Sequence, residues 1–182
     1  PSLTTGACEN VRIGSITAGE PEQECVDCLF RRNRIVGGNV GLAIQSWKDG
    51  GDSDSWGGII ENNIIILPEN TSSTTFAANI SGRESDNGGI DNADTLIRNN
   101  SMIIGDNASA PAGADSAAFD LRDNTGTYVV RNNTIRIDGL GENVCFKYAS
   151  NANLADRIDT DYNLCDRLAD PGTNGWGAPG GA

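Results

Sequence analysis

Histidine is absent from the 182-residue chain, and this absence removes imidazole chemistry. Ser–His and Cys–His catalysis and imidazole metal sites are excluded, so proton transfer would have to use Asp, Glu, Lys, Arg or Tyr. Aromatic residues make up only 5% of the chain. No apolar run approaches the ~20 residues that a membrane-spanning helix needs, so we expect no membrane insertion.

Basic residues are also scarce, because 13 Lys and Arg stand against 25 Asp and Glu, for a net charge of −12. The chain lacks a stripe of cations that could neutralise phosphates, which excludes nucleic acid as a partner. An anionic membrane surface is disfavoured for the same reason. An acidic polymer would need a bridging cation or a local basic patch.

The cysteine pattern favours structural roles over metal or redox chemistry. The five cysteines are Cys8, Cys25, Cys28, Cys145 and Cys165. Their odd number leaves at least one thiol free or paired between chains. The CxxC at Cys25 and Cys28 has no second pair for zinc and no βαβ context for thioredoxin-like chemistry, so we expect disulfides or buried cysteines. The chain begins at Pro1 with no signal peptide, and we interpret it as processed or as part of a longer protein.

A phrase with asparagine between apolar residues recurs along the chain. It reads LFRRNRIV, IIENNIIIL, LIRNNSMII and VVRNNTIRI, with a weaker copy in DTDYNLCDRL. The equivalent residues, here called the ladder asparagines, are Asn33, Asn63, Asn100, Asn133 and Asn163. They lie 30, 37, 33 and 30 residues apart. Clustered intervals of this size are typical of a repeat that keeps its strands and varies its loops.

Each repeat also carries a later strand with alternating apolar residues. These strands read VGLAIQSW, TFAANIS, SAAFDLRD and NVCFKYA. Period-two alternation indicates half-buried strands. We predict that the inward residues are Leu42, Ile44, Phe76, Ala78, Ile80, Ala117, Phe119, Leu121, Val144, Phe146 and Tyr148.

One repeat therefore reads strand, Asn turn, strand, loop, strand, loop. Such a unit cannot bury its apolar face alone, whereas stacked units bury a continuous core. Asparagine tolerates the left-handed backbone of a tight corner, and stacked amides can hydrogen-bond along the axis. We expect the flanking Ile, Val and Met residues to point inward. The alternatives are an antiparallel sandwich, which does not predict the asparagine register, and a propeller, which needs four strands per repeat over about 40 residues.

The phrases IENNIII, IRNNSMI and VRNNTIRI, followed by DYNLC, resemble right-handed parallel β-helix repeats of the pectin lyase-like superfamily. The resemblance implies an all-β solenoid of about five coils over residues 29–168. It leaves 1–28 as an irregular coil or cap and 169–182 as a Gly/Pro-rich tail. It also implies a secreted or cell-surface location. The superfamily includes lyases, hydrolases, epimerases, tailspikes, adhesins and scaffolds, so it fixes no function.

Family members that act on polysaccharides bind them along one sheet face. The outward positions of the later strands form two predicted columns, namely Gln45, Asn79, Asp120, Lys147 and Trp47, Ser81, Arg122, Ala149. The resemblance implies Lys147 as a lyase base, Arg122 as electrostatic partner and Asp120 as metal or orienting group. An ordinary cross-strand ion pair between Asp120 and Lys147 is the alternative. A two-carboxylate hydrolase fits less well, because only Asp120 is available.

Two acidic loops provide candidate ligands for Ca²⁺, which binds oxygen. Their aspartates are Asp49, Asp52 and Asp54 in one loop and Asp86, Asp91 and Asp94 in the next. A solvated acidic loop is the alternative. Trp47 and Trp56 flank the first loop and, with Gln45 and Asn79, are candidates for sugar binding, although each Trp could instead anchor the loop.

Two hypotheses of function remain. One is an extracellular module that binds a polysaccharide, with calcium and with lyase-type cleavage as a possible activity. The other is a non-catalytic structural or adhesive protein of a surface layer, fibre or phage spike. In the second hypothesis the partners are other copies of the chain, because a solenoid has open strand edges at its two ends.

Overall fold

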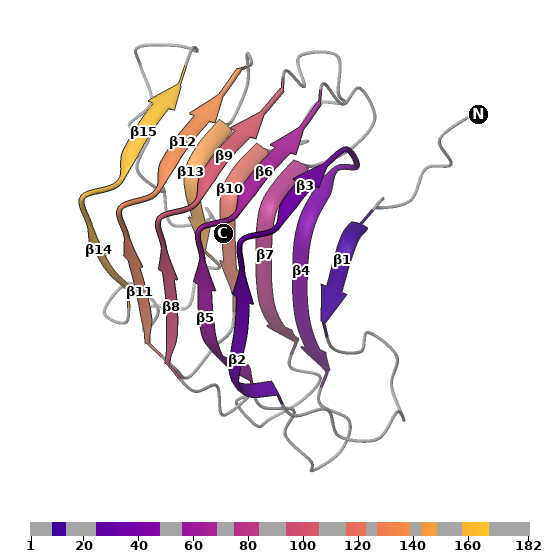
Figure 1. The fold of residues 1–182 in the computed structure, drawn as a ribbon, viewed down its shortest axis with the longest axis vertical. Helices are drawn as coiled ribbons and strands as arrows, with labels where there is room; N and C mark the ends of the chain where they lie inside the picture. Colours follow the sequence, from indigo (N-terminus) through magenta and orange to yellow (C-terminus); the bar gives the residue numbers. More distant parts are fainter. Residues whose placement is uncertain are drawn as a thin grey trace.

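The computed structural model describes residues 9–13, 25–47, 56–68, 75–83, 94–105, 116–122, 127–138, 143–148 and 158–167. Within these ranges every regular element is a strand, and the strands form three parallel sheets (Figure 1). Sheet A contains β1 (Glu9–Ile13), β4 (Val40–Trp47), β7 (Thr75–Arg83), β10 (Ser116–Arg122) and β13 (Asn143–Tyr148). Sheet B contains β2 (Cys25–Arg31), β5 (Trp56–Glu61), β8 (Thr95–Arg98), β11 (Tyr128–Arg131) and β14 (Ile158–Asp161). Sheet C contains β3 (Arg34–Val36), β6 (Ile64–Leu67), β9 (Ser101–Ile104), β12 (Thr134–Ile137) and β15 (Leu164–Arg167).

The chain visits the sheets in the fixed order A, B, C and then returns to A. Each strand therefore pairs with strands three elements away, as β4 does with β1 and β7. Sheets B and C meet at a corner and together face sheet A across the interior (Figure 1). This is a parallel β-helix, as the sequence predicts. A sandwich and a propeller are ruled out for the described strands, because all of their pairings are parallel.

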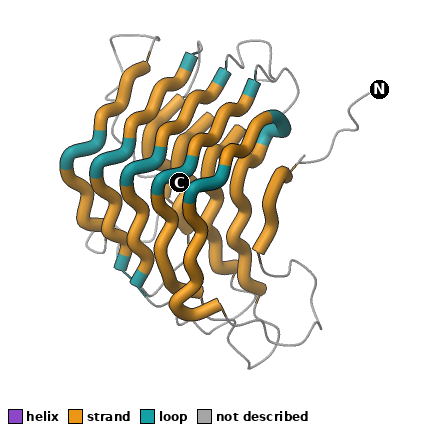
Figure 2. The backbone as a smooth tube through the Cα atoms, viewed as in Figure 1, coloured by secondary structure: helices purple, strands orange, loops and turns teal. Residues whose placement is uncertain are grey.

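The corner between sheets B and C has the same backbone in every coil, by which we mean one A–B–C passage (Figure 2). One residue at each corner has a positive φ of 54–58°, and these residues are Arg32, Asn62, Asn99, Asn132 and Tyr162. The ladder asparagine follows it directly. The prediction that the ladder residue itself takes the left-handed backbone is therefore wrong by one position. The left-handed residue turns the chain, and this turn directs the next side chain into the stack.

The ladder asparagines bond to one another along the stack. Asn63 donates to Asn100 Oδ1 with both its backbone nitrogen and Nδ2, each at 3.0 Å, and Asn100 does the same to Asn133 at 3.0 and 2.9 Å. Asn33 bonds to Asn63 in this way, and Asn133 bonds to Asn163. Each side chain after the first also donates to a carbonyl of the preceding coil, as Asn100 Nδ2 does to Ile60 O at 3.0 Å. The predicted ladder is confirmed, and its buried amides are satisfied.

The interior is filled by aliphatic side chains of all three sheets. Alternate residues of sheets B and C point inward, such as Ile60 and Ile97 in sheet B and Ile65 and Met102 in sheet C. Their neighbours point outward, so the prediction that all flanking Ile residues face inward is wrong for Ile64, which is exposed.

Sheet A departs from simple alternation. Two consecutive residues of one strand pack into the interior cluster, namely Ala77 with Ala78 in β7 and Ala118 with Phe119 in β10. A flat strand sends consecutive side chains to opposite faces, so these strands bend at this place, and their curvature is visible in Figure 1. Ala117, which was predicted to face inward, instead packs with Val40 and Ala43 in a separate cluster. The other predicted inward residues with described side chains join the interior cluster, namely Leu42, Ile44, Ala78, Ile80, Phe119, Leu121 and Phe146.

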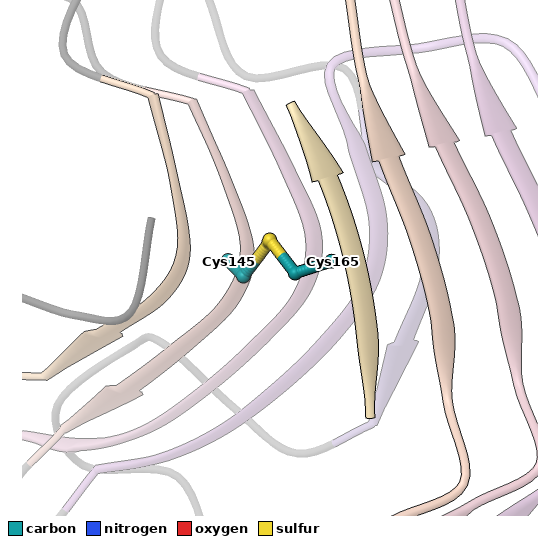
Figure 3. Close-up of a disulfide and its surroundings, with 2 residues drawn as sticks. All are labelled: Cys145 and Cys165. Carbon is teal, nitrogen blue, oxygen red and sulfur yellow. A yellow bond between two sulfur atoms is a disulfide. The ribbon is translucent and has the colours of Figure 1, made fainter. Parts of the chain in front are cut away.

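A disulfide crosses the interior at the last described coil. Cys145 of β13 bonds to Cys165 of β15, joining sheet A to sheet C over a sequence separation of 20 residues (Figure 3). Cys28 is also disulfide-bonded. The expectation of disulfides or buried cysteines is confirmed for these three residues. The bulge at β2 explains Gly58 on the neighbouring strand, because a Cβ there would lie 2.1 Å from Cys28 O.

Candidate functional site

The register of sheet A brings together part of the predicted catalytic column. Asp120 lies directly beside Asn79 on one side and beside Lys147 on the other. Adjacent strands are ~4.8 Å apart, so these positions are immediate neighbours. Gln45 does not join them, because Ala43 pairs with Asn79. The column that contains Asp120 is therefore Ala43, Asn79, Asp120 and Lys147.

The second predicted column shifts by the same two residues at β4. Gln45 pairs with Ser81, which pairs with Arg122. Trp47 pairs with Arg83 and stands outside the column to which the sequence assigned it. Arg122 thus remains two positions along the strand from Asp120, on the same side of the bend. The described structure gives the backbone of Gln45, Trp47, Asn79, Arg122, Lys147 and Trp56, whereas their side chains lie outside the described part.

Asp120 itself is fully buried, with 0% of its surface exposed. Three other residues of sheet A that pack together outside the interior cluster, Val40, Ala43 and Ala117, are buried as well. The carboxylate is engaged in a polar interaction. The sequence predicts a solvated sheet face with a substrate groove, and these four side chains contradict that at the centre of sheet A. The catalytic roles of Lys147, Arg122 and Asp120 stay predictions, and a substrate could contact the Asp120 side chain only if the atoms that bury it moved aside.

Most of the predicted calcium ligands lie outside the described residues, namely Asp49, Asp52, Asp54, Asp86 and Asp91. Asp94 is described, and it links two neighbouring coils by accepting a 3.1 Å hydrogen bond from the backbone nitrogen of Thr127. In the described ranges, no group of three or more Cys, Asp or Glu side chains is arranged to hold a metal ion. Asp94 therefore contributes a hydrogen bond between coils just before β8, and its role in calcium binding stays a prediction.

The outer face of sheet B is open and carries two columns. The first is aliphatic until its last member and contains Leu29, Ile59, Leu96, Val129 and Asp159. The second is charged and contains Arg31, Glu61, Arg98, Arg131 and Asp161. Inside the stack these charges are paired, since Arg98 bonds to Glu61 at 2.8 Å and Arg131 bonds to Asp159. Leu29 is half exposed, so this face shows both apolar surface and ion pairs to solvent.

The outer face of sheet C is similar in kind. One column contains Arg34, Ile64, Ser101, Thr134 and Leu164, and the next contains Val36, Ile66, Ile103, Arg136 and Asp166. Ile64, Val36 and Ile103 form exposed aliphatic surface on neighbouring strands. Arg136 donates to Asp138 at 2.7 Å, and this hydrogen bond raises the pKa of the guanidinium.

The two ends of the described stack differ in charge. The first corner exposes Arg31, Arg32 and Arg34, here called the basic end. The last corner exposes Asp159, Asp161 and Asp166, here called the acidic end, together with Tyr162, which is 78% exposed. The sequence analysis missed this difference. The signal was available in the repeat itself, because the first copy reads FRRNR where the last reads TDYNL.

No protein-family model matches the chain, and no curated protein or solved structure shows significant similarity to it. The parallel β-helix is therefore established by strand pairing and the ladder, and membership of the pectin lyase-like superfamily stays a prediction. In the described part of the chain, no helix has the length and hydropathy required to cross a membrane.

Proposed function

We propose that the chain is a non-catalytic structural or adhesive module, a right-handed β-helix of about five coils that works by stacking with other copies of itself. One observation carries the proposal: the three sheets end together in the same coil at both ends, with β1, β2 and β3 at one end and β13, β14 and β15 at the other. Each terminal strand pairs on one side only among the described strands. Such edges present N–H and C=O groups that template pairing with another chain.

Exposure at the last coil supports this function. Thr160 occupies an inward position in the register, next to Val130, yet it is exposed, whereas Val130 is buried. A further coil placed on this end would bury Thr160, as each coil buries the inward side chains of its neighbour inside the stack.

The burial of Asp120 supports a function without catalysis. A lyase base and its charge partner need contact with the substrate at hydrogen-bonding distance. Asp120, at the centre of the predicted catalytic column, is instead fully buried, as is Ala43 in the same column.

Light scattering on the purified chain, over a wide range of concentration and with or without calcium, tests this function. We expect species well above the 19.1 kDa of one chain, with no change on adding polysaccharide. A monomer at every concentration would refute self-assembly.

Extracellular polysaccharide binding is the second candidate, and the charged column of sheet B favours it. Arg31, Arg98 and Arg131 repeat along the axis of an otherwise acidic chain, and a polyuronate that displaced Glu61 and Asp159 from Arg98 and Arg131 would find three cations in one column. Calcium held by the acidic loops would add bridging charge, and Trp47 and Trp56 would stack on sugar rings. Titration calorimetry with a polyuronate, with calcium and with chelator, tests binding. The absorbance of unsaturated products tests lyase-type cleavage.

A further inference from the structure

We infer that two copies join head to tail, with the acidic end of one chain on the basic end of the next, so that all three sheets and the asparagine ladder continue across the junction. This inference rests on the proposed self-assembly and specifies its geometry. Strand β14 would pair with β2 of the next copy, β15 with β3, and β13 with β1. Three observations carry it, namely the direction of the ladder, the charge of the ends and the constant register of the columns.

The ladder has a direction. Every bond between its members runs from the backbone nitrogen and Nδ2 of one asparagine to Oδ1 of the next in sequence. Asn163 is the last member, so its backbone N–H and one Nδ2 hydrogen point onward from the stack. Asn33 is the first member, so its Oδ1 occupies the acceptor position that every later asparagine fills for the coil before it. Donors at one end and an acceptor at the other match only when the ends meet head to tail.

The charges match in the same orientation. The register along sheet B is constant at the last residue of each strand, so Asp161 of one copy would lie beside Arg31 of the next. Side chains directly opposite on neighbouring strands attract when their charges are opposite and repel when they are alike. At the corner, Tyr162 would lie beside Arg32, where a guanidinium can stack on the ring. Asp27 is also exposed on β2, but it lies at the bulge, away from the corner.

The opposite arrangement, in which two like ends meet around a two-fold axis, fails on both counts. It would oppose arginine to arginine and ladder acceptor to acceptor at the basic end, or aspartate to aspartate and ladder donor to donor at the acidic end. It would also make the strands antiparallel across the junction, whereas all described pairings within the chain are parallel. A head-to-tail contact that continues the stack along its own axis does not close into a ring, so it grows into a filament.

A charge exchange at one junction tests this geometry. Arg31→Asp should weaken self-association by at least about tenfold, because Asp161 would then face an aspartate. Asp161→Arg should do the same. The chain that carries both substitutions should associate again to within about threefold of the wild type, because the exchanged charges face each other across every junction. Arg136→Asp is the matched control, since it changes the net charge equally but lies on β12, which is paired on both sides.

Each measurement is sedimentation equilibrium or light scattering at one salt concentration, with thermal unfolding as a check that the variants fold. Asp161 also accepts a hydrogen bond from the nitrogen of Tyr162, so Asp161→Asn provides a variant that keeps this acceptor and removes only the charge. It should weaken association less than Asp161→Arg does. Recovery in the double variant would support head-to-tail joining. Assembly that ignores all of these substitutions would overturn the inference while leaving self-assembly intact, and a monomeric wild type would refute both.

Discussion

The corner between sheets B and C and the outer face of sheet A differ in what fixes their register. At the corner, each ladder asparagine bonds to the next, so the same residue recurs in every coil. On the outer face of sheet A, one column contains Ala43, Asn79, Asp120 and Lys147, which share neither size nor charge. Where a side chain bonds to the equivalent side chain of the next coil, the same residue type is required in each coil, and the repeat can be recognised in the sequence. Where each coil packs differently, the residue type varies and the repeat cannot be recognised.

Replacement of a central ladder asparagine should give the largest loss of stability. In Asn100→Ala, the backbone nitrogen and Nδ2 of Asn63 lose their acceptor, and Ile60 O and Asn133 Oδ1 lose a donor. These groups are buried, and unsatisfied buried polar groups cost roughly 1–3 kcal/mol each, with partial relaxation. We expect a loss of about 3–5 kcal/mol in the free energy of unfolding, measured by chemical denaturation.

The same substitution at the end of the ladder serves as the control. Asn33 is partly exposed and has a ladder partner on one side only, so Asn33→Ala should cost about 1 kcal/mol. Equal losses at Asn33 and Asn100 would mean that the ladder bonds contribute little and that the two alanines act only through local turn formation.

Asp120→Ala should give the next largest effect and tests the covered face of sheet A directly. Removal of the buried carboxylate leaves its polar partner without a hydrogen bond, so we expect the free energy of unfolding to fall by about 2 kcal/mol. Asp166→Ala is the control on an exposed face and should change the free energy of unfolding by less than about 0.5 kcal/mol. If both substitutions changed the free energy of unfolding by similarly small amounts, the result would support the open, solvated face that the sequence predicts.

The sequence predicted the parts of the fold that repeat and failed where coils differ. The three strands per repeat and the five ladder positions were correct, because the asparagine phrase and the apolar alternation are local patterns. The left-handed residue was misplaced, since both residues are asparagine in three of the five corners, and only Arg32 and Tyr162 reveal that the first of them turns the chain. Gln45 and Trp47 were assigned two positions away from their true partners on β7. The loops between the repeats differ in length, and a local sequence pattern cannot predict how such a difference changes the register.

The candidate site was harder to predict than the fold for a physical reason. The burial of Asp120 depends on what covers sheet A, and alternation along β10 predicts only that the residue faces away from the interior. The bend at Ala118 and Phe119 moves Ala117 outward, although alternation with Phe119 predicts it inside. The charge of the two ends, by contrast, was readable from FRRNR and TDYNL once the repeats were aligned.

Substitution of the left-handed corner residue should have a moderate effect. A β-branched side chain is strained at positive φ, so Asn99→Val should cost about 1–2 kcal/mol, whereas Asn99→Gly should be neutral within about 0.5 kcal/mol. Thermal unfolding of the two variants measures the difference. Because Asn99 is exposed, solvent rather than packing surrounds its side chain. A valine that costs no more than glycine would show that the corner relaxes to another backbone.

The smallest effect is expected on the outer face of sheet C, where an exposed residue and a buried residue that are adjacent in the chain can be compared. Ile103 is exposed and Ile104 is fully buried, although they adjoin in β9. Ile103→Thr should change the free energy of unfolding by less than about 0.5 kcal/mol, while Ile104→Thr should cost about 2–3 kcal/mol through a buried hydroxyl and lost packing. Light scattering on the Ile103 variant adds a second result: head-to-tail joining predicts unchanged assembly, because this side chain lies far from both ends of the stack. Loss of assembly would instead identify the aliphatic face as a contact between parallel stacks.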